Sequence, residues 1–163
     1  MGSGKTTLGS RLAAELRIPF LDLDARIEAV AARAVRAIFA SEGEVGFRRR
    51  EHAALAALVA EAPARCIVAT GGGVVELAAA NSLLPALGHV VWLRADPDVC
   101  VARLGAASQT RPLLDGDWRA LWKRREPLYA AVAAAVVDTH PASIETSLAA
   151  LHAVWNAGNH AGD

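Results

Sequence analysis

The chain opens with Met1-Gly2-Ser3-Gly4-Lys5-Thr6-Thr7-Leu8, and this stretch decides the fold. Its Gly-Lys-Thr stands directly before a helical pattern in which Leu8, Leu12 and Leu16 share one face. The order matches the second half of the phosphate-binding pattern GxxxxGK[ST]. Glycines let backbone amides turn inward around phosphate oxygens, and the helix N-terminus adds partial positive charge. The stretch therefore predicts a loop that holds the phosphates of a nucleotide.

Two side chains of this loop have predicted chemical roles. Lys5 would reach the outer phosphates and act in phosphoryl transfer, and the Thr6 hydroxyl would be a ligand of Mg²⁺. Backbone amides and side chains of the whole loop would surround the nucleotide. The candidate ATP-binding residues here are Gly2, Ser3, Gly4, Lys5, Thr6 and Thr7.

The first glycine of this pattern and the strand that feeds the loop would both lie before Met1. We therefore expect the sequence to be a fragment that lacks a central strand, although a natural chain that begins at Met1 stays an alternative. Removing a central strand leaves the backbone groups of its two neighbours unpaired. We expect such a chain to fold poorly and to have little activity.

The rest of the chain alternates short apolar strands with helices. Strands are predicted at 18–21, 66–69, 89–93 and 135–138. Helices are predicted at 8–16, 24–32, 35–40, 44–61, 75–86, 97–104, 118–134 and 143–155, followed by a polar tail over 156–163. This alternation indicates an α/β fold, with a parallel sheet covered by helices on both faces.

Length and composition exclude several classes of protein. With 163 residues the chain is expected to form a single domain over 1–163. Lys and Arg number 17 and Asp and Glu also 17, so bulk charge does not favour nucleic acid or an anionic membrane. Cys66 and Cys100 have no CxxC spacing, which fits a reducing cytoplasm. The apolar stretch from Cys66 to Leu93, whose only charge is Glu76, is broken by glycines, Asn81 and Pro85, so we expect no membrane span.

Polar and glycine residues gather where two predicted strands end. Asp22 and Asp24 follow one strand, and Gly71, Gly72 and Gly73 follow another. Turn formation alone could explain either cluster. Because ligands of parallel α/β sheets bind at the carboxyl ends of the strands, the two clusters together predict a site at that edge.

With these residues in view, the chain resembles the shikimate kinase family from Gly2 to about Thr139. The family implies transfer of the γ-phosphoryl group of ATP to the 3-hydroxyl of shikimate. It also implies a P-loop kinase fold, a three-layer α/β/α arrangement with five parallel strands, and a mobile lid, here about 105–117. The matching stretches are Gly-Ser-Gly-Lys-Thr-Thr (2–7), Asp-Leu-Asp with Ile27-Glu28 (22–28), Ile38-Phe39, Gly43-Glu44, Phe47-Arg48-Arg49 followed by Glu51, Thr70-Gly71-Gly72-Gly73, Arg111-Pro112-Leu113-Leu114, and Arg125-Glu126-Pro127-Leu128-Tyr129.

The resemblance implies a role for each matched residue. Asp24 would hold the acceptor hydroxyl and serve as base, and the shikimate site would be Asp24, Arg48, Gly72 and Arg125. Asp22 would lie near Mg²⁺, with ATP as co-substrate. The residue types agree, because an Arg fork suits a carboxylate better than Lys does.

The lid carries a further implied role. Arg111 would close over the transferred phosphate and take part in catalysis, and Arg103 would stack on adenine in the ATP site. A plain surface loop is the alternative for 105–117. We expect a cytoplasmic monomer that binds ATP and shikimate and neither nucleic acid nor a membrane.

Two other functions stay open at this point. One is another small P-loop kinase, such as a gluconate kinase or a nucleoside monophosphate kinase, although the latter would need several lid arginines and 105–117 offers one. The other is a non-catalytic, kinase-like module that senses a small ligand. The presence of Lys5, Asp24 and Arg111 favours catalysis over sensing.

Overall fold

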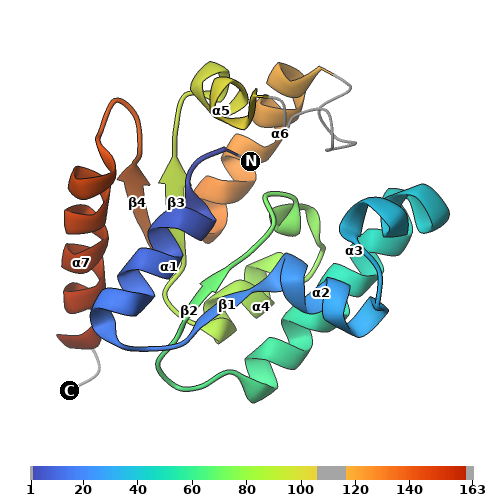
Figure 1. The fold of residues 1–163 in the computed structure, drawn as a ribbon, viewed down its shortest axis with the longest axis horizontal. Helices are drawn as coiled ribbons and strands as arrows, with labels where there is room; N and C mark the ends of the chain where they lie inside the picture. The colour runs from blue at the N-terminus through green and yellow to red at the C-terminus, as the bar shows by residue number, and fades with distance from the viewer. Residues whose placement is uncertain (1, 106–116, 161–163) are drawn as a thin grey trace.

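The computed structural model describes residues 2–105 and 117–160 and has a mixed α/β fold (Figure 1). In chain order its elements are α1 (Lys5–Leu16), β1 (Phe20–Asp22), α2 (Leu23–Ala31), α3 (Val35–Glu61), β2 (Ile67–Ala69), the 3₁₀ helix η1 (Val74–Glu76), α4 (Ala80–Leu87), β3 (Val91–Arg94), α5 (Pro97–Leu104), α6 (Trp118–Val132), β4 (Ala135–Asp138) and α7 (Ile144–His160).

Local signals explain where several helices begin and end. Gly4 precedes α1 in the left-handed conformation, with φ 89°, which a residue without Cβ adopts at little cost. Asp22, Asp96 and Asp117 cap α2, α5 and α6, and each accepts hydrogen bonds from two backbone amides of the first turn. These caps confirm the helix starts expected from the sequence to within a few residues.

Some boundaries differ from the sequence prediction. The stretch predicted as one helix over 75–86 is divided into η1 and α4, since the backbone at Leu77 is extended. The stretches 35–40 and 44–61 are both helical and form α3, which kinks at Gly43, where φ is 67°. The predicted polar tail is wrong as far as residue 160, because α7 continues to His160. Exposed polar residues still form helical backbone hydrogen bonds, at a propensity cost of about 1 kcal/mol or less per residue, so polarity alone did not mark the end of the helix.

The strands form two parallel pairs, β1 with β2 and β3 with β4. Phe20 is opposite Ile67 in the first pair, and Val91 is opposite Ala135 in the second. Within each pair the chain crosses over through helices, as parallel strands require. The described residues contribute four parallel strands in two separate sheets, and the first of the five strands that the resemblance implies, expected before Met1, is not among them.

A cavity of 410 Å³ separates β2 from β3. Its lining includes Ile67, Val68 and Ala69 of β2, Val91 of β3, Leu12 of α1 and Leu151 of α7. No strand pairing joins β2 to β3 within residues 2–105 and 117–160. Each of these two strands therefore uses only one edge for strand pairing.

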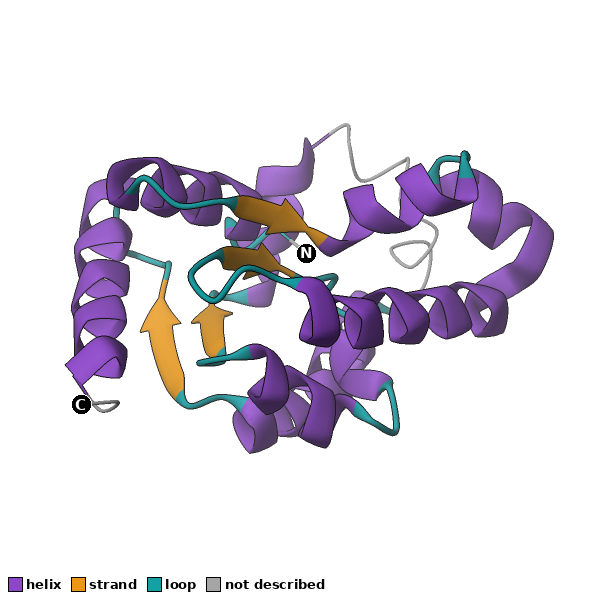
Figure 2. Cartoon of the chain, turned by 90° about the horizontal axis from the view of Figure 1, so that it is seen from below, coloured by secondary structure: helices purple, strands orange, loops and turns teal. Residues whose placement is uncertain are grey.

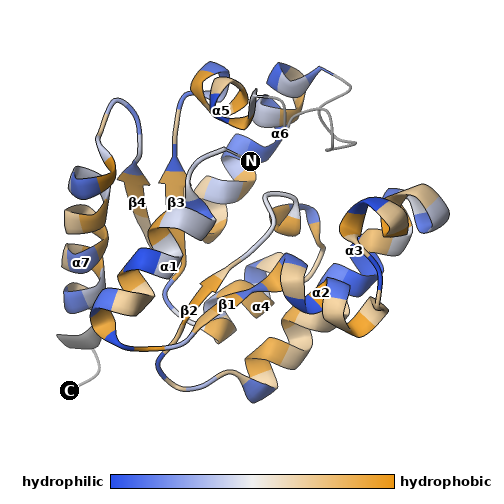
Figure 3. Ribbon diagram, in the orientation of Figure 1, coloured by the Kyte–Doolittle hydropathy of each residue, from blue (hydrophilic) through white to orange (hydrophobic). Residues whose placement is uncertain are grey.

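Helices cover the strands on two faces, which gives three layers (Figure 2). One core holds Leu8 and Leu12 of α1 with Leu148 and Leu151 of α7, packed against Ile67 and Val91. The other lies under α2, α3, α4 and α6, with Leu23, Ile27, Ile38, Leu55 and Leu58 among its buried residues and Val68 packed against it. Ile67 and Val68 thus contact opposite cores, as successive residues of a strand must. Figure 3 shows β3 and β4 as predominantly hydrophobic, which suits strands between two helical layers.

Among the described residues, none of the helices combines the length and the apolar composition that a membrane span requires.

Candidate active site

The N-terminal loop contacts two other parts of the fold. Gly2 has φ 74°, and a Cβ there would lie 2.2 Å from the backbone oxygen of Cys100 in α5. The next residue, Ser3, is buried, and Lys5 is the first residue of α1. Arg103 donates to the Gly2 carbonyl at 3.4 Å and to the Thr139 carbonyl at 2.7 Å. The loop is therefore held between α5 and the segment after β4 in a shape that only glycine permits at position 2.

Thr6 and Asp22 come together at the carboxyl end of β1. The Thr6 hydroxyl donates to Asp22 Oδ2 at 3.4 Å. The other carboxylate oxygen, Asp22 Oδ1, accepts from the amides of Asp24 at 3.0 Å and Ala25 at 3.2 Å. One carboxylate oxygen is thus committed to the start of α2, while the other faces the loop that the sequence predicts to bind phosphate.

Asp24 lies in the first turn of α2 and faces the glycines that follow β2. A Cβ on Gly71 would lie 3.2 Å from Asp24 Oδ1 and 2.9 Å from Glu51 Oε1. Both carboxylates therefore approach the same glycine. A side chain at position 71 would occupy the space of these two carboxylates, which explains why this residue is glycine.

Glu51 is fully buried, and its Oε2 accepts from Arg48 at 2.6 Å. Its Oε1 has no hydrogen-bond partner within the part of the chain that the structure describes. Burial raises the pKa of the Glu51 carboxyl, Asp24 adds to the rise, and Arg48 opposes it. An unpartnered buried oxygen beside Asp24 is suited to receive a hydrogen bond from a ligand hydroxyl.

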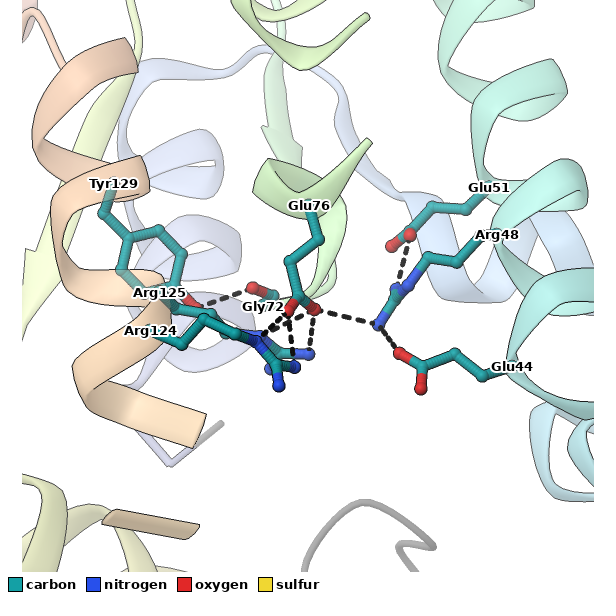
Figure 4. A network of polar contacts seen from close by, with 8 residues as sticks. All are labelled: Glu44, Arg48, Glu51, Gly72, Glu76, Arg124, Arg125 and Tyr129. Atoms are coloured by element: carbon teal, nitrogen blue, oxygen red, sulfur yellow. Dashed lines mark hydrogen bonds and ion pairs between the residues drawn. The ribbon is translucent and has the colours of Figure 1, made fainter. Parts of the chain in front are cut away.

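Three arginines and three glutamates form one network, which we call the arginine cluster (Figure 4). Its members are Glu44, Arg48, Glu51, Glu76, Arg124 and Arg125. Arg48 and Arg125 are the two arginines that the resemblance implies for the acceptor site, and they come from α3 and α6, on opposite sides of η1. The structure therefore brings together two residues that are 77 positions apart in the sequence.

The carboxylate of Glu76 joins the two sides of the cluster. Its Oε2 accepts from Nε of Arg125 at 2.9 Å and from Nη2 at 2.6 Å, and Nη2 of Arg48 lies 3.5 Å from the same oxygen. Its Oε1 accepts from Arg124 at 2.6 and 2.9 Å. Burial raises the pKa of the Glu76 carboxyl, but hydrogen bonds from Arg125 and Arg124 outweigh burial and hold that pKa below its ordinary value. Glu76 is consequently ionised at neutral pH.

The glycine segment after β2 forms the floor of this cluster. The hydroxyl of Tyr129 donates to the Gly72 carbonyl at 2.6 Å, and burial raises the pKa of that hydroxyl, which therefore stays protonated. A Cβ on Gly73 would lie 2.1 Å from Nη2 of Arg48. Gly71 and Gly73 thus allow Asp24, Glu51 and Arg48 to approach the backbone closely.

A cavity of 160 Å³ links the loop to the arginine cluster. Ser3 and Lys5 line one part of it, and Gly71, Gly72 and Arg125 line another. The same cavity extends over Trp118 and Trp122 of α6. A phosphate on the loop and a small acid on the arginines would therefore have access to a common space.

Of the residues predicted from the sequence, Ser3, Lys5, Gly72 and Arg125 line this cavity. Thr6 contacts Asp22, and Asp24 and Arg48 lie against Gly71 and Gly73. Arg103 lies in the last turn of α5, and its contacts are to backbone carbonyls. Arg111 and the predicted lid, apart from its end residues Gly105 and Asp117, lie outside the described residues.

Sequence reasoning assigned no role to Glu51, Glu76 or Tyr129. A signal existed for Glu76, the only charge in a long uncharged stretch, which directly follows the three glycines. Glu51 and Tyr129 were quoted within matching stretches, but their contacts with Arg48 and Gly72 depend on how distant elements pack.

Comparison with known proteins agrees with this geometry. The family model described as shikimate kinase matches residues 1–154. A shikimate kinase of Symbiobacterium thermophilum is 43% identical over 157 residues, which cover 91% of this chain and 88% of the relative.

Solved structures give the same result. The shikimate kinase of Acinetobacter baumannii in complex with shikimate is similar with a TM-score of 0.84 and 35% identity, covering 96% of this chain and 89% of that one. The shikimate kinase of Aquifex aeolicus is similar with a TM-score of 0.82 and 28% identity, covering 100% of this chain and 95% of that one. The family model matches residues 1–154, and a relative that is 43% identical covers 91% of the chain: this chain belongs to the shikimate kinase family.

Proposed function

We propose that this protein transfers the γ-phosphoryl group of ATP to the 3-hydroxyl of shikimate. The observation that carries the proposal is that Arg125 and Lys5 line one cavity, while Arg48 and Asp24 lie against the glycines beside it. Guanidinium forks on one side suit a carboxylate, and a carboxylate on the other suits a hydroxyl. A small hydroxy acid fits both, with its hydroxyl directed toward the phosphate loop.

The site residues divide the work of this reaction between the acceptor and the nucleotide. Arg48, Arg125 and Gly72 bind and orient the acceptor, and Asp24 holds the attacking hydroxyl and takes its proton. Gly2, Ser3, Gly4, Lys5, Thr6 and Thr7 surround the phosphates of ATP, where Lys5 neutralises charge on the transferred group. Arg103 is a nucleotide-side residue, and Arg111 would add positive charge at the transferred phosphate. Phosphoryl transfer depends on the positioning of the two substrates and on charge neutralisation more than on a covalent enzyme intermediate.

The residues present fit a Mg²⁺ ion carried with ATP. A threonine hydroxyl and a carboxylate oxygen 3.4 Å apart are hard oxygen donors of the kind that Mg²⁺ prefers. Within the described residues there is no group of three or more His, Cys, Asp or Glu side chains that could hold a metal by itself. Thr6 and Asp22 would therefore hold the ion together with the nucleotide phosphates and water. When bound, the ion would neutralise charge on the phosphates.

The chain would act as a single domain and a monomer in the cytoplasm. The two cores lie on either side of the same strands, which supports one cooperative unit.

An ATP-coupled assay on a panel of acceptors tests this proposal. The protein should phosphorylate shikimate and leave gluconate and nucleoside monophosphates unchanged, and Lys5→Met should abolish turnover. Preference for gluconate would favour the other small kinases. Tight binding of shikimate without turnover, measured by calorimetry, would indicate a ligand-sensing module.

A further inference from the structure

The Glu76 carboxylate lies where the arginines of the cluster would receive the carboxylate of an acceptor. It takes up the Nε and Nη2 donors of Arg125 and approaches Nη2 of Arg48. Both Arg125 donors converge on Oε2 of Glu76, and such charge-assisted hydrogen bonds are the contacts that an incoming carboxylate would make in its place. In Figure 4 the Glu76 side chain extends from η1 into the space between Arg48 and Arg125.

The charges of the cluster are already balanced without a ligand. Arg48, Arg124 and Arg125 face Glu44, Glu51 and Glu76. Arg48 is also bonded to Glu51 at 2.6 Å and to Glu44 at 3.0 Å, so its charge is largely compensated before Glu76 is considered. An incoming carboxylate would add a fourth negative group to three positive ones. Repulsion would act between that ligand and Glu76, the only one of the three glutamates that contacts arginines from both sides.

The backbone around Glu76 is held in place, so the side chain of Glu76 is the part that can move. Val74 and Val75 are buried, and η1 is closed by hydrogen bonds from Val74 to Gly71 and from Glu76 to Gly73. The Glu76 carboxylate keeps contact with solvent, with 17% of its side chain exposed, and Arg124 on its outer side is 63% exposed. Rotation of Glu76 toward Arg124 and solvent would therefore release Arg125 without disturbing the core.

We propose that Glu76 is a specificity-determining residue that occupies the acceptor-carboxylate position in the free protein and must be displaced by the carboxylate of the substrate. The inference rests on the proposed function, since it concerns the acceptor site of that reaction. Only a ligand that offers its own carboxylate to Arg48 and Arg125 compensates these arginines for the loss of Glu76. Uncharged polyols of similar shape are consequently excluded, and the affinity for the true acceptor is reduced by the competition.

The test is Glu76→Gln, which keeps the size of the side chain and removes its charge. We expect KM for shikimate to fall about three- to tenfold, because the competing state is weakened, with kcat within about twofold of the parent protein. The dissociation constant of shikimate from calorimetry should fall in parallel. Glu61→Gln is the matched control: Glu61 pairs with Arg26 away from the cluster, and neither constant should change.

A second ligand tests the specificity. A cyclohexene triol that lacks the carboxylate must displace Glu76 without compensating the arginines, so Glu76→Gln should improve its binding at least as much as that of shikimate. Unchanged binding of the triol in folded Glu76→Gln would contradict the role of Glu76 in specificity. Glu76→Ala should reproduce the effects of Glu76→Gln. Melting temperatures should be measured for both variants, and if Glu76→Gln unfolds, Glu76→Ala supplies the test.

A rise in KM for shikimate, or an unchanged KM, in folded Glu76→Gln would overturn the inference and would mean that Glu76 positions the arginines instead. These outcomes differ from a failure of the proposed function, in which the parent protein itself would neither bind nor phosphorylate shikimate.

Discussion

Gly73 allows Arg48 to lie directly against the backbone of the glycine segment. Its own backbone is in the right-handed region, with φ −89° and ψ −5°, so an L residue would fit the backbone without strain. A Cβ there would nevertheless lie 2.1 Å from Nη2 and 2.4 Å from Cζ of Arg48. The need for glycine at this position comes from the arginine that it contacts and not from the turn.

Gly73→Ala should therefore weaken acceptor binding and also lower the free energy of unfolding, because the fully buried Glu51 would lose its bond to Arg48. Arg48 is the flexible partner and would move, giving up its place in the cluster, and loss of a charge-assisted bond typically costs about 2–3 kcal/mol. We expect KM for shikimate to rise roughly 30- to 150-fold while KM for ATP stays nearly unchanged. Gly158→Ala is the control, because its Cβ would meet His89 at an ordinary 3.8 Å. Equal changes in both KM values would contradict the assignment of Arg48 to the acceptor.

Asp24 should contribute more to turnover than to binding. Asparagine keeps the size and one oxygen acceptor but cannot take a proton, so Asp24→Asn should lower kcat on the order of 10²-fold, with a modest change in KM for shikimate. Steady-state kinetics with both substrates would measure this. Near-full kcat in Asp24→Asn would show that another group, with Glu51 as the nearest carboxylate, accepts the proton.

At the scale of elements, the turn from β1 into α2 combines a structural task with a functional one. Asp22 ends β1 and caps α2 through Oδ1, while Oδ2 is held by Thr6 at the start of α1. One side chain therefore sets the relative position of three elements. The predicted metal role and the structural role use different oxygens of the same carboxylate.

Two substitutions at Asp22 should separate these roles. Asp22→Asn can keep the cap through its amide oxygen, so the free energy of unfolding should change little, and its loss of activity should be partly relieved by raising Mg²⁺. Asp22→Ala should show the same Mg²⁺ dependence and also lose about 1 kcal/mol of unfolding free energy. The measurements are denaturant unfolding and kcat across a Mg²⁺ titration.

Asp96→Ala is the matched control at another helix cap. Asp96 caps α5 by accepting from the amides of Asp98 and Val99, so its loss should cost a similar unfolding free energy. It should leave the Mg²⁺ dependence unchanged. If Mg²⁺ rescued Asp24→Asn and not Asp22→Asn, the roles given to the two aspartates would be exchanged.

For the whole molecule, the dominant feature is the division of the strands into two parallel pairs. Ile67 donates from its amide to the Pro19 carbonyl beside β1, and Thr139 donates to the Arg94 carbonyl of β3. These bonds lie on the edge of β2 that faces β1 and on the edge of β3 that faces β4. Because successive backbone groups of a strand point to opposite sides, the amides of Val68, Val91 and Leu93 point toward the 410 Å³ cavity.

Hydrogen exchange should reveal this division. We expect the amides of Val68, Val91 and Leu93 to exchange at least tenfold faster than those of Ile67 and Thr139, because amides without a backbone partner exchange through smaller openings of the fold. Nuclear magnetic resonance on the full chain would measure the rates residue by residue. Equal protection of both groups would show that the facing edges of β2 and β3 are paired in solution.

The sequence by itself determined much of the local structure and the chemistry of the site. Gly-Lys-Thr before an amphipathic helix predicted the loop and α1, and the aspartates and glycines after two short strands predicted a site at one edge of the sheet. These signals are local, because backbone conformation and capping depend on residues a few positions apart. The matching stretches also indicated the family, which the family model confirmed.

Only the tertiary structure decided how distant residues meet. That Glu76 binds Arg125 and Arg124, that Glu51 faces Asp24 across Gly71, and that Tyr129 holds Gly72 follow from the packing of η1, α3 and α6. The same holds for the division between β2 and β3. The physical reason is that side-chain contacts across a fold depend on the positions of whole elements, and no periodicity along the chain records those positions.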